Sequence, residues 1–125
     1  MGELLDTHVF LKVLRDDPLP RQVERALGKS DAELYVSIVT AWEIAIKPQL
    51  GFDPSDVEAG IARMGAQILQ IRFEHLTQFW ALPLFPDHRE PYDRLLIAQA
   101  ISEDLRMVSN DMRFSDYKKL RLLWD

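Results

Sequence analysis

The chain has 125 residues, of which 47% are hydrophobic and none is cysteine. This length and composition predict one folded domain and exclude disulfide bonds and thiolate metal sites. With 20 acidic and 15 basic residues the net charge is -5, so a generally basic nucleic-acid-binding surface is excluded and any nucleic acid must meet a local basic rim or metal ions.

Apolar runs are short and interrupted by charged residues, and the first residues show no basic stretch followed by an apolar one. We therefore expect no membrane-spanning segment and no secretory signal. The lack of cysteine agrees with a reducing compartment, and we expect a cytoplasmic location.

The chain begins with a predicted strand and two helices. Residues 3–6 form a short apolar run that ends in an acid, which favours a buried strand. Thr7 is a candidate cap for the helix that follows, and residues 16–20 interrupt that helix. Pro20 suits the first turn of a second helix, which Gly28 ends.

A second strand is predicted at residues 33–37, which are rich in strand-forming residues. A helix over 39–47 follows and stops at Pro48. The next helix begins with Asp53 as its cap and ends at Gly65.

The remainder of the chain predicts three more strands, two helices and a loop. Residues 67–72 alternate like a half-buried strand, and a helix over 74–81 follows. The 83–91 loop leads into a helix, after which strands are predicted at 105–109 and 120–124. This alternation of strands and helices predicts an α/β domain with a mainly parallel central sheet.

Four acids from distant parts of the chain are predicted to meet at one edge of this sheet. Asp6 ends the first strand, and Asp111 follows the fourth strand. Glu43 lies in the predicted first turn of the helix that leaves the second strand, and Asp93 opens the helix that leads to the fourth. Ligands of parallel sheets gather at the carboxyl ends of the strands.

Each acid also has a purely structural interpretation. Thr40 and Glu43 fit a capping box. Asp93 fits a first-turn acid favoured by the helix dipole, with Glu90 as the cap before it. Asp111 fits a turn residue, and Asp6 could simply end a strand before the helix that Thr7 caps.

Taken together, the four carboxylates favour a cation site. Crowded carboxylates repel one another, and a cation relieves that repulsion. Oxygen ligands without cysteine or a histidine cluster point to Mg²⁺ or Mn²⁺ rather than zinc. Such a site suits the hydrolysis of phosphodiester bonds.

Four segments, LLDTHVFL, VSIVTAWEIAIK, HREPYDRLLIAQA and MVSNDMRFSDY, have the order and spacing found in PIN-domain proteins. The chain most closely resembles VapC-type toxins of bacterial toxin–antitoxin systems. The resemblance implies a PIN-like three-layer α/β/α sandwich over residues 1–125. It also implies an Mg²⁺- or Mn²⁺-dependent endoribonuclease, a homodimer, and a VapB- or Phd-like antitoxin as partner.

The resemblance assigns roles to individual residues. The four family acids correspond to Asp6, Glu43, Asp93 and Asp111. Asp6, Asp93 and Asp111 are expected to hold the metal, whereas Glu43 would orient or deprotonate the attacking water. Supporting roles are implied for Thr7, Ser109 and Glu90, the last of which stands where relatives usually have aspartate.

Basic, histidine and tryptophan side chains are secondary candidates. The residues that could form a basic rim for RNA are Lys47, Arg89, Arg94 and Arg113. A solvated surface position is the alternative for each of them. His8 and His88 could assist proton transfer, although a lone histidine rarely does. Tryptophans 42, 80 and 124 are expected to pack rather than to stack on bases.

Two other functions remain open. A PIN fold could act as a catalytically weak scaffold that mainly binds the antitoxin and serves autoregulation. Alternatively, the acids could serve phosphotransfer to a small molecule, although the chain has no glycine-rich phosphate loop.

Overall fold

A five-stranded sheet forms the centre of the computed structural model, which describes residues 2–124. The strands are β1 (Glu3–Leu5), β2 (Leu34–Ser37), β3 (Gln67–Leu69), β4 (Arg106–Val108) and β5 (Arg121–Leu123). They lie in the order β3-β2-β1-β4-β5, and every neighbouring pair is parallel. This confirms the predicted α/β class and the mainly parallel sheet.

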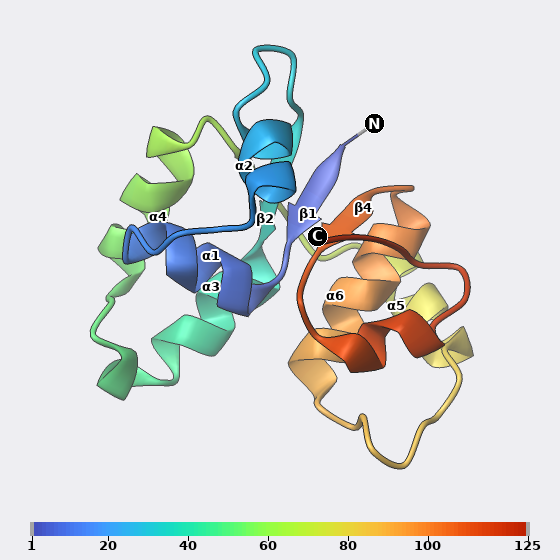
Figure 1. Cartoon of the computed structure of the whole chain (residues 1–125). Coiled ribbons are helices and arrows are strands. Elements are labelled where there is room, and N and C mark those ends of the chain that lie inside the picture. Colours follow the sequence, from blue (N-terminus) through green and yellow to red (C-terminus); the bar gives the residue numbers. More distant parts are fainter. Residues whose placement is uncertain (1, 125) are drawn as a thin grey trace.

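Helices cover both faces of the sheet. The helices are α1 (Thr7–Leu14), α2 (Arg21–Leu27), α3 (Ile38–Ala45), α4 (Pro54–Arg63), α5 (Phe73–Ala81) and α6 (Pro91–Ser102), with short 3₁₀ helices η1 (Pro48–Leu50) and η2 (Met112–Asp116). In Figure 1, α1, α2 and α4 lie on one side of the strands, and α5 and α6 lie on the other. The predicted three-layer α/β/α sandwich is confirmed. Within residues 2–124, no helix combines the length and apolar character needed to cross a membrane.

Alternating side chains of the strands supply two separate hydrophobic cores. Leu4 and Met107 pack into the core beneath α6, whereas their neighbours Leu5 and Val108 pack into the core beneath α1 and α4. Because successive residues of a strand point to opposite faces, even these three-residue strands contribute to both layers.

Two predicted helix starts are wrong. The side chain of Asp6, not Thr7, caps α1 by accepting a hydrogen bond from the Val9 N–H at 2.8 Å. Helix α3 begins at Ile38 with Ser37 as its cap, one residue earlier than predicted. Thr40 therefore lies inside the helix, and the proposed capping box between Thr40 and Glu43 does not form.

Other boundaries are closer to prediction. Asp53 caps α4, as the sequence indicated, and it also forms a reciprocal capping box with Asp56. Pro20, predicted in the first turn of α2, is instead the residue that precedes it. The predicted strand at 67–72 is shortened to Gln67–Leu69, because it lies at the edge of the sheet and is largely exposed.

Candidate metal centre

The centre lies where the order of the strands reverses direction. The chain proceeds outward from β1 to β2 and β3 on one side and reaches β4 and β5 on the other. Parallel α/β sheets place their ligands at such a switch point, beyond the carboxyl ends of the strands. Asp6 follows β1 there, and Ser109 and Asp111 follow the adjacent β4. The Asp6 N–H donates to the Val108 carbonyl at 3.1 Å, which joins the two strand ends.

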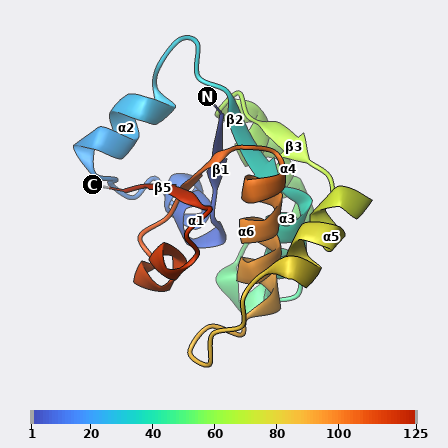
Figure 2. The same ribbon diagram turned by 90° about the vertical axis from the view of Figure 1, so that its right-hand side faces the viewer.

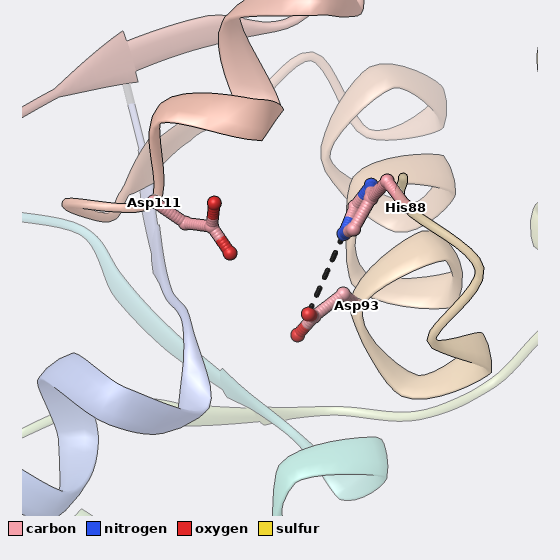
Figure 3. A group of neighbouring side chains, drawn as sticks. All are labelled: His88, Asp93 and Asp111. Atoms are coloured by element: carbon pink, nitrogen blue, oxygen red, sulfur yellow. Dashed lines mark ion pairs between the residues drawn. The ribbon is translucent and has the colours of Figure 1, made fainter. Parts of the chain in front are cut away.

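Three side chains face one small space at this edge of the sheet. Possible ligand atoms of His88, Asp93 and Asp111 all lie within 4.8 Å of one another. Figure 3 shows Asp111 approaching from the segment after β4, opposite His88 on the loop and Asp93 at the start of α6. The structure therefore brings together two of the predicted metal ligands, with a histidine as the third member of the group.

Asp6 is a buried carboxylate whose ionised form is disfavoured. Its side chain is almost fully buried, and this burial raises its pKa to about 6, from an ordinary value of 3.8. Hydrogen bonds from Ser109 and Val9 act in the opposite direction, and the negative charge of Asp93 raises the pKa further. Asp6 does not belong to the group formed by His88, Asp93 and Asp111, but it interacts electrostatically with Asp93.

Asp93 connects the four acids. Its pKa is raised, first by burial and then by the charge of Glu43, and the charge of Asp111 adds to this. Asp93 thus interacts electrostatically with each of the other three predicted acids.

Glu43 lies in the second turn of α3, not in the first turn as predicted. One of its oxygens accepts a hydrogen bond from Lys47 at 2.8 Å, one helical turn further on. The other, Oε1, is buried without a hydrogen-bond partner among the described residues. Buried polar atoms are rarely left without a partner, so Oε1 has capacity for an additional ligand.

Asp111 already has a cationic partner. The Arg113 guanidinium holds both of its oxygens, through Nε at 3.1 Å and Nη2 at 2.8 Å. This arginine lowers the pKa of Asp111, in contrast to the raised pKa values of Asp6 and Asp93. Arg113 was predicted to contact RNA, but in the structure it lies on an acid of the site itself.

The residues with predicted supporting roles lie close to the acids. Ser109 Oγ accepts a hydrogen bond from the Asp111 N–H at 3.1 Å, which orders the start of that turn. Thr7 bonds to Thr40 at 3.1 Å and so joins α1 to α3. Glu90 occupies the cap position of α6, as expected, but its side chain makes no capping hydrogen bond and is exposed.

Three further secondary candidates differ from their predicted settings. The Arg94 side chain is buried, with its guanidinium 4.8 Å from the centre of the Phe79 ring, so it does not lie on an exposed rim. Trp80 was predicted to pack, yet it is 89% exposed. Trp42 is also largely exposed, with an edge-on contact to Tyr92.

His88 is the residue of the centre that sequence reasoning gave too little weight. Its Nδ1 lies 2.9 Å from the Tyr117 hydroxyl, and its Nε2 lies 3.5 Å from Asp93 Oδ2. In the tautomer with the ring proton on Nε2, Nδ1 accepts a hydrogen bond from the Tyr117 hydroxyl and the Nε2–H faces the Asp93 carboxylate. The distance of 3.5 Å from Nε2 to Asp93 Oδ2 is too long for a strong hydrogen bond, and Nε2 is buried without a hydrogen-bond partner among the described residues. In the sequence, His88 stands only five residues before Asp93, which indicated that it could lie near that acid. Nothing in the sequence indicated its contact with Tyr117.

The donor set fits a small, hard divalent cation. Asp6 and Asp93 are buried carboxylates with raised pKa values, Asp111 faces Asp93, and one oxygen of Glu43 has no hydrogen-bond partner among the described residues. Oxygen ligands of this kind are typical of Mg²⁺ and Mn²⁺ sites.

Comparison with protein families matches residues 4–120 to the PIN domain. The chain belongs to the PIN domain family. This agrees with the predicted fold, since the match runs from within β1 to beyond β4 and includes all six α-helices. No curated protein matches the chain.

Solved structures with the same fold include chains of bacterial toxin–antitoxin complexes. The PIN domain matches a chain of VapBC2 from Rickettsia felis, bound to a promoter DNA fragment, at 16% identity and a TM-score of 0.77 over 100% of both chains. It matches a chain of DNA-bound VapBC from Salmonella typhimurium at 17% identity and a TM-score of 0.72, over 98% of this chain and 97% of that one. A chain of FitAcB from Neisseria gonorrhoeae matches at 18% identity and a TM-score of 0.65, over 97% and 96%.

Proposed function

We propose that this PIN domain is a VapC-type endoribonuclease toxin that cleaves RNA phosphodiester bonds with Mg²⁺ or Mn²⁺. PIN domains are generally nucleases that use divalent metals. The observation that carries the proposal is the meeting of buried, charge-coupled carboxylates at the switch point of the sheet. Solvated surface acids would show neither this burial nor this coupling.

The residues of the site have three different proposed roles: metal binding, activation of water, and positioning of Asp93. Asp6, Asp93 and Asp111 would hold the cation, which supplies Lewis-acid activation and stabilises the leaving oxygen when it is bound. Glu43 would orient the attacking water and accept its proton at Oε1, the atom without a partner among the described residues. His88 would fix the Asp93 carboxylate from the opposite side.

The test is cleavage of RNA by the purified chain in the presence of Mg²⁺ or Mn²⁺, compared with the same reaction in EDTA. We expect cleavage that depends on the metal and is lost in Asp93→Asn. Asp31→Asn, which changes an exposed loop acid, is the matched control and should cleave like the wild type. Equal cleavage by wild type and Asp93→Asn would overturn the proposal. Stable binding to an antitoxin without any cleavage would favour the weakly catalytic scaffold.

We also propose an antitoxin of the VapB or Phd type as partner. The support is the fold shared with chains of VapBC complexes. Co-expression with the protein encoded beside this chain should relieve any growth arrest that the chain causes and should yield a stable complex. Growth arrest that persists in the presence of that neighbour, without complex formation, would contradict this partner.

A homodimer is proposed from the exposed apolar surface of α5. Phe73 and Trp80 are 83% and 89% exposed, and Leu76 lies between them at helical spacing. Large apolar patches on a soluble protein often mark interfaces. Light scattering should give the mass of a dimer for the wild type and of a monomer for Trp80→Glu. A monomeric wild type would contradict the proposal.

A further inference from the structure

A pocket of about 390 Å³ lies beside the metal centre and is separate from the acids. It is lined by Leu84, Phe85, Pro86, His88, Arg89 and Arg94. The loop that forms most of it extends beyond the ends of α5 and α6, as Figure 2 shows. Two arginines and no acid line this pocket, although the chain as a whole carries a net charge of -5.

Arg94 is the unusual side chain of this pocket. It is only 7% exposed, and no carboxylate among the described residues pairs with it. Of its five N–H donors, a single one is bonded within the described part of the chain, to the Pro83 carbonyl at 3.3 Å, and its Nε is buried without a partner there. A buried charge without a counter-ion is costly, and an anion in the pocket would relieve that cost.

The pocket adjoins the site of the proposed chemistry through one residue. The His88 ring belongs to the lining of the pocket, while its Nε2 faces Asp93 in the metal centre. A ligand in the pocket is therefore one side chain away from Asp93. A nucleic-acid strand that crosses the acids carries further phosphates on both sides, and guanidinium groups bind phosphate well.

The remaining lining is apolar. Leu84 is largely exposed, and Phe85 is held by an edge-on contact with Tyr117, with ring centres 5.0 Å apart. Apolar and aromatic side chains of this kind suit the flat face of a base or a ribose, as in other single-strand binding sites.

We propose that this pocket binds one nucleotide of the RNA strand next to the cleaved bond, with Arg94 and Arg89 on its phosphate. The inference rests on the proposed ribonuclease function and adds a subsite to it. The subsite gives an acidic protein a local positive contact for RNA, and it places that contact on the 82–90 loop and the first turn of α6 rather than on the wider surface.

The test measures binding of a fluorescent, single-stranded RNA of mixed sequence in the presence of Mg²⁺. All variants are made in a Glu43→Gln background, so that cleavage does not consume the probe. Arg94→Met keeps the packing against Phe79 and removes the charge, whereas Arg89→Gln changes an exposed residue and so leaves the fold unaffected. Arg25→Gln, on the exposed face of α2, is the matched control.

Arg94→Met should weaken RNA binding about tenfold, the effect of losing one charge-assisted hydrogen bond. The slope of log affinity against log salt should become shallower by about 0.7 for each lost phosphate contact. Arg89→Gln should show the same change to a smaller degree, and Arg25→Gln should bind like the background. A melting curve establishes whether each variant is folded. If Arg94→Met is unfolded, the salt slope of Arg89→Gln alone tests the subsite.

Unchanged affinity and salt slope in both arginine variants, with RNA still bound and cleaved by the wild type, would overturn the subsite and leave the ribonuclease proposal intact. The subsite is also overturned if the two variants bind RNA normally but lose affinity for the antitoxin, since the pocket would then be a protein-docking site. No RNA binding by the background, together with no cleavage by the wild type, would overturn both proposals.

Discussion

The four acids of the candidate metal centre form two pairs with different surroundings. Glu43 and Asp111 each have an intramolecular cation, Lys47 at 2.8 Å and Arg113 at 2.8 Å. Asp6 and Asp93 have no lysine or arginine partner among the described residues, and burial raises the pKa of both. We call Glu43 and Asp111 the paired acids, and Asp6 and Asp93 the unpaired acids.

The cationic partners of the paired acids reduce the number of carboxylates that need a metal ion. Mutual repulsion of four carboxylates predicted a cation, but the chain itself neutralises two of them. The need for a cation therefore rests on the unpaired acids, whose charges are opposed by burial and by each other. Substitutions in the two pairs should consequently have opposite effects on the stability of the metal-free protein.

The largest expected effect is on cleavage. Asp6→Asn and Asp93→Asn should each reduce metal-dependent RNA cleavage at least about a hundredfold, because both remove a charge that would hold the cation. Initial rates with a labelled RNA measure this. If both variants cleave like the wild type, the unpaired acids are not the metal ligands.

Asp6→Asn should stabilise the metal-free protein in a way that depends on pH. Because the pKa of folded Asp6 is about 6 and its ordinary value is 3.8, ionisation costs the folded state more than the unfolded state. Stability of the wild type therefore falls as the pH rises through this window. The variant, which retains the cap on Val9, should gain on the order of 2–3 kcal/mol at pH 7.5. At a pH below 3.8 the gain should vanish.

Urea denaturation at both pH values measures this gain. Asp31→Asn, the substitution of an exposed loop acid that is not one of the four acids, is the control. A gain of the same size at low and neutral pH would mean that the substitution at position 6 improves packing and that charge is not the cause.

His88→Gln and Tyr117→Phe test how Asp93 is held. Residues that orient a metal ligand typically contribute about tenfold to a hundredfold to affinity, so both variants should weaken Mn²⁺ binding by that factor. Tyr117→Phe keeps the ring packing and removes only the hydroxyl that is hydrogen-bonded to His88 Nδ1. Mn²⁺ affinity unchanged in both would show that Asp93 needs no support from His88.

The smallest effect is expected at the paired acids. Arg113→Gln removes the partner of Asp111, and because this ion pair is partly exposed, the free energy of unfolding should change by less than about 1 kcal/mol. The pKa of Asp111 should rise towards its ordinary value, and Mn²⁺ should bind slightly more tightly because no guanidinium competes for the carboxylate. NMR titration of the Asp111 carboxyl measures the pKa. A fall of that pKa would show that Arg113 is not its main partner.

The fold was largely predictable because its signals are local. Caps, prolines and apolar runs located each α-helix and strand of the described residues to within a few residues, and Asp53 capped α4 as expected. The errors at Thr7 and Thr40 share one cause: a single sequence cannot show which of several nearby polar residues caps a helix. Asp6 caps α1 and Ser37 caps α3 instead.

The site was predictable only in part. The positions of Asp6 and Asp111 followed from strand ends, since carboxyl ends of parallel strands share an edge. The partners of the acids did not follow, because they depend on side-chain direction. Arg94 turned inward against Phe79, Arg113 folded back on Asp111, and His88 met Tyr117 across 29 residues of sequence.

Calorimetric titration of Mn²⁺ into the metal-free protein tests the central claim most directly. We expect the wild type to bind Mn²⁺, Asp93→Asn to lose this binding, and Asp31→Asn to retain it. Binding of Mn²⁺ to Asp93→Asn with wild-type affinity, or no binding by the folded wild type at millimolar metal, would contradict the claim that the unpaired acids form a cation site.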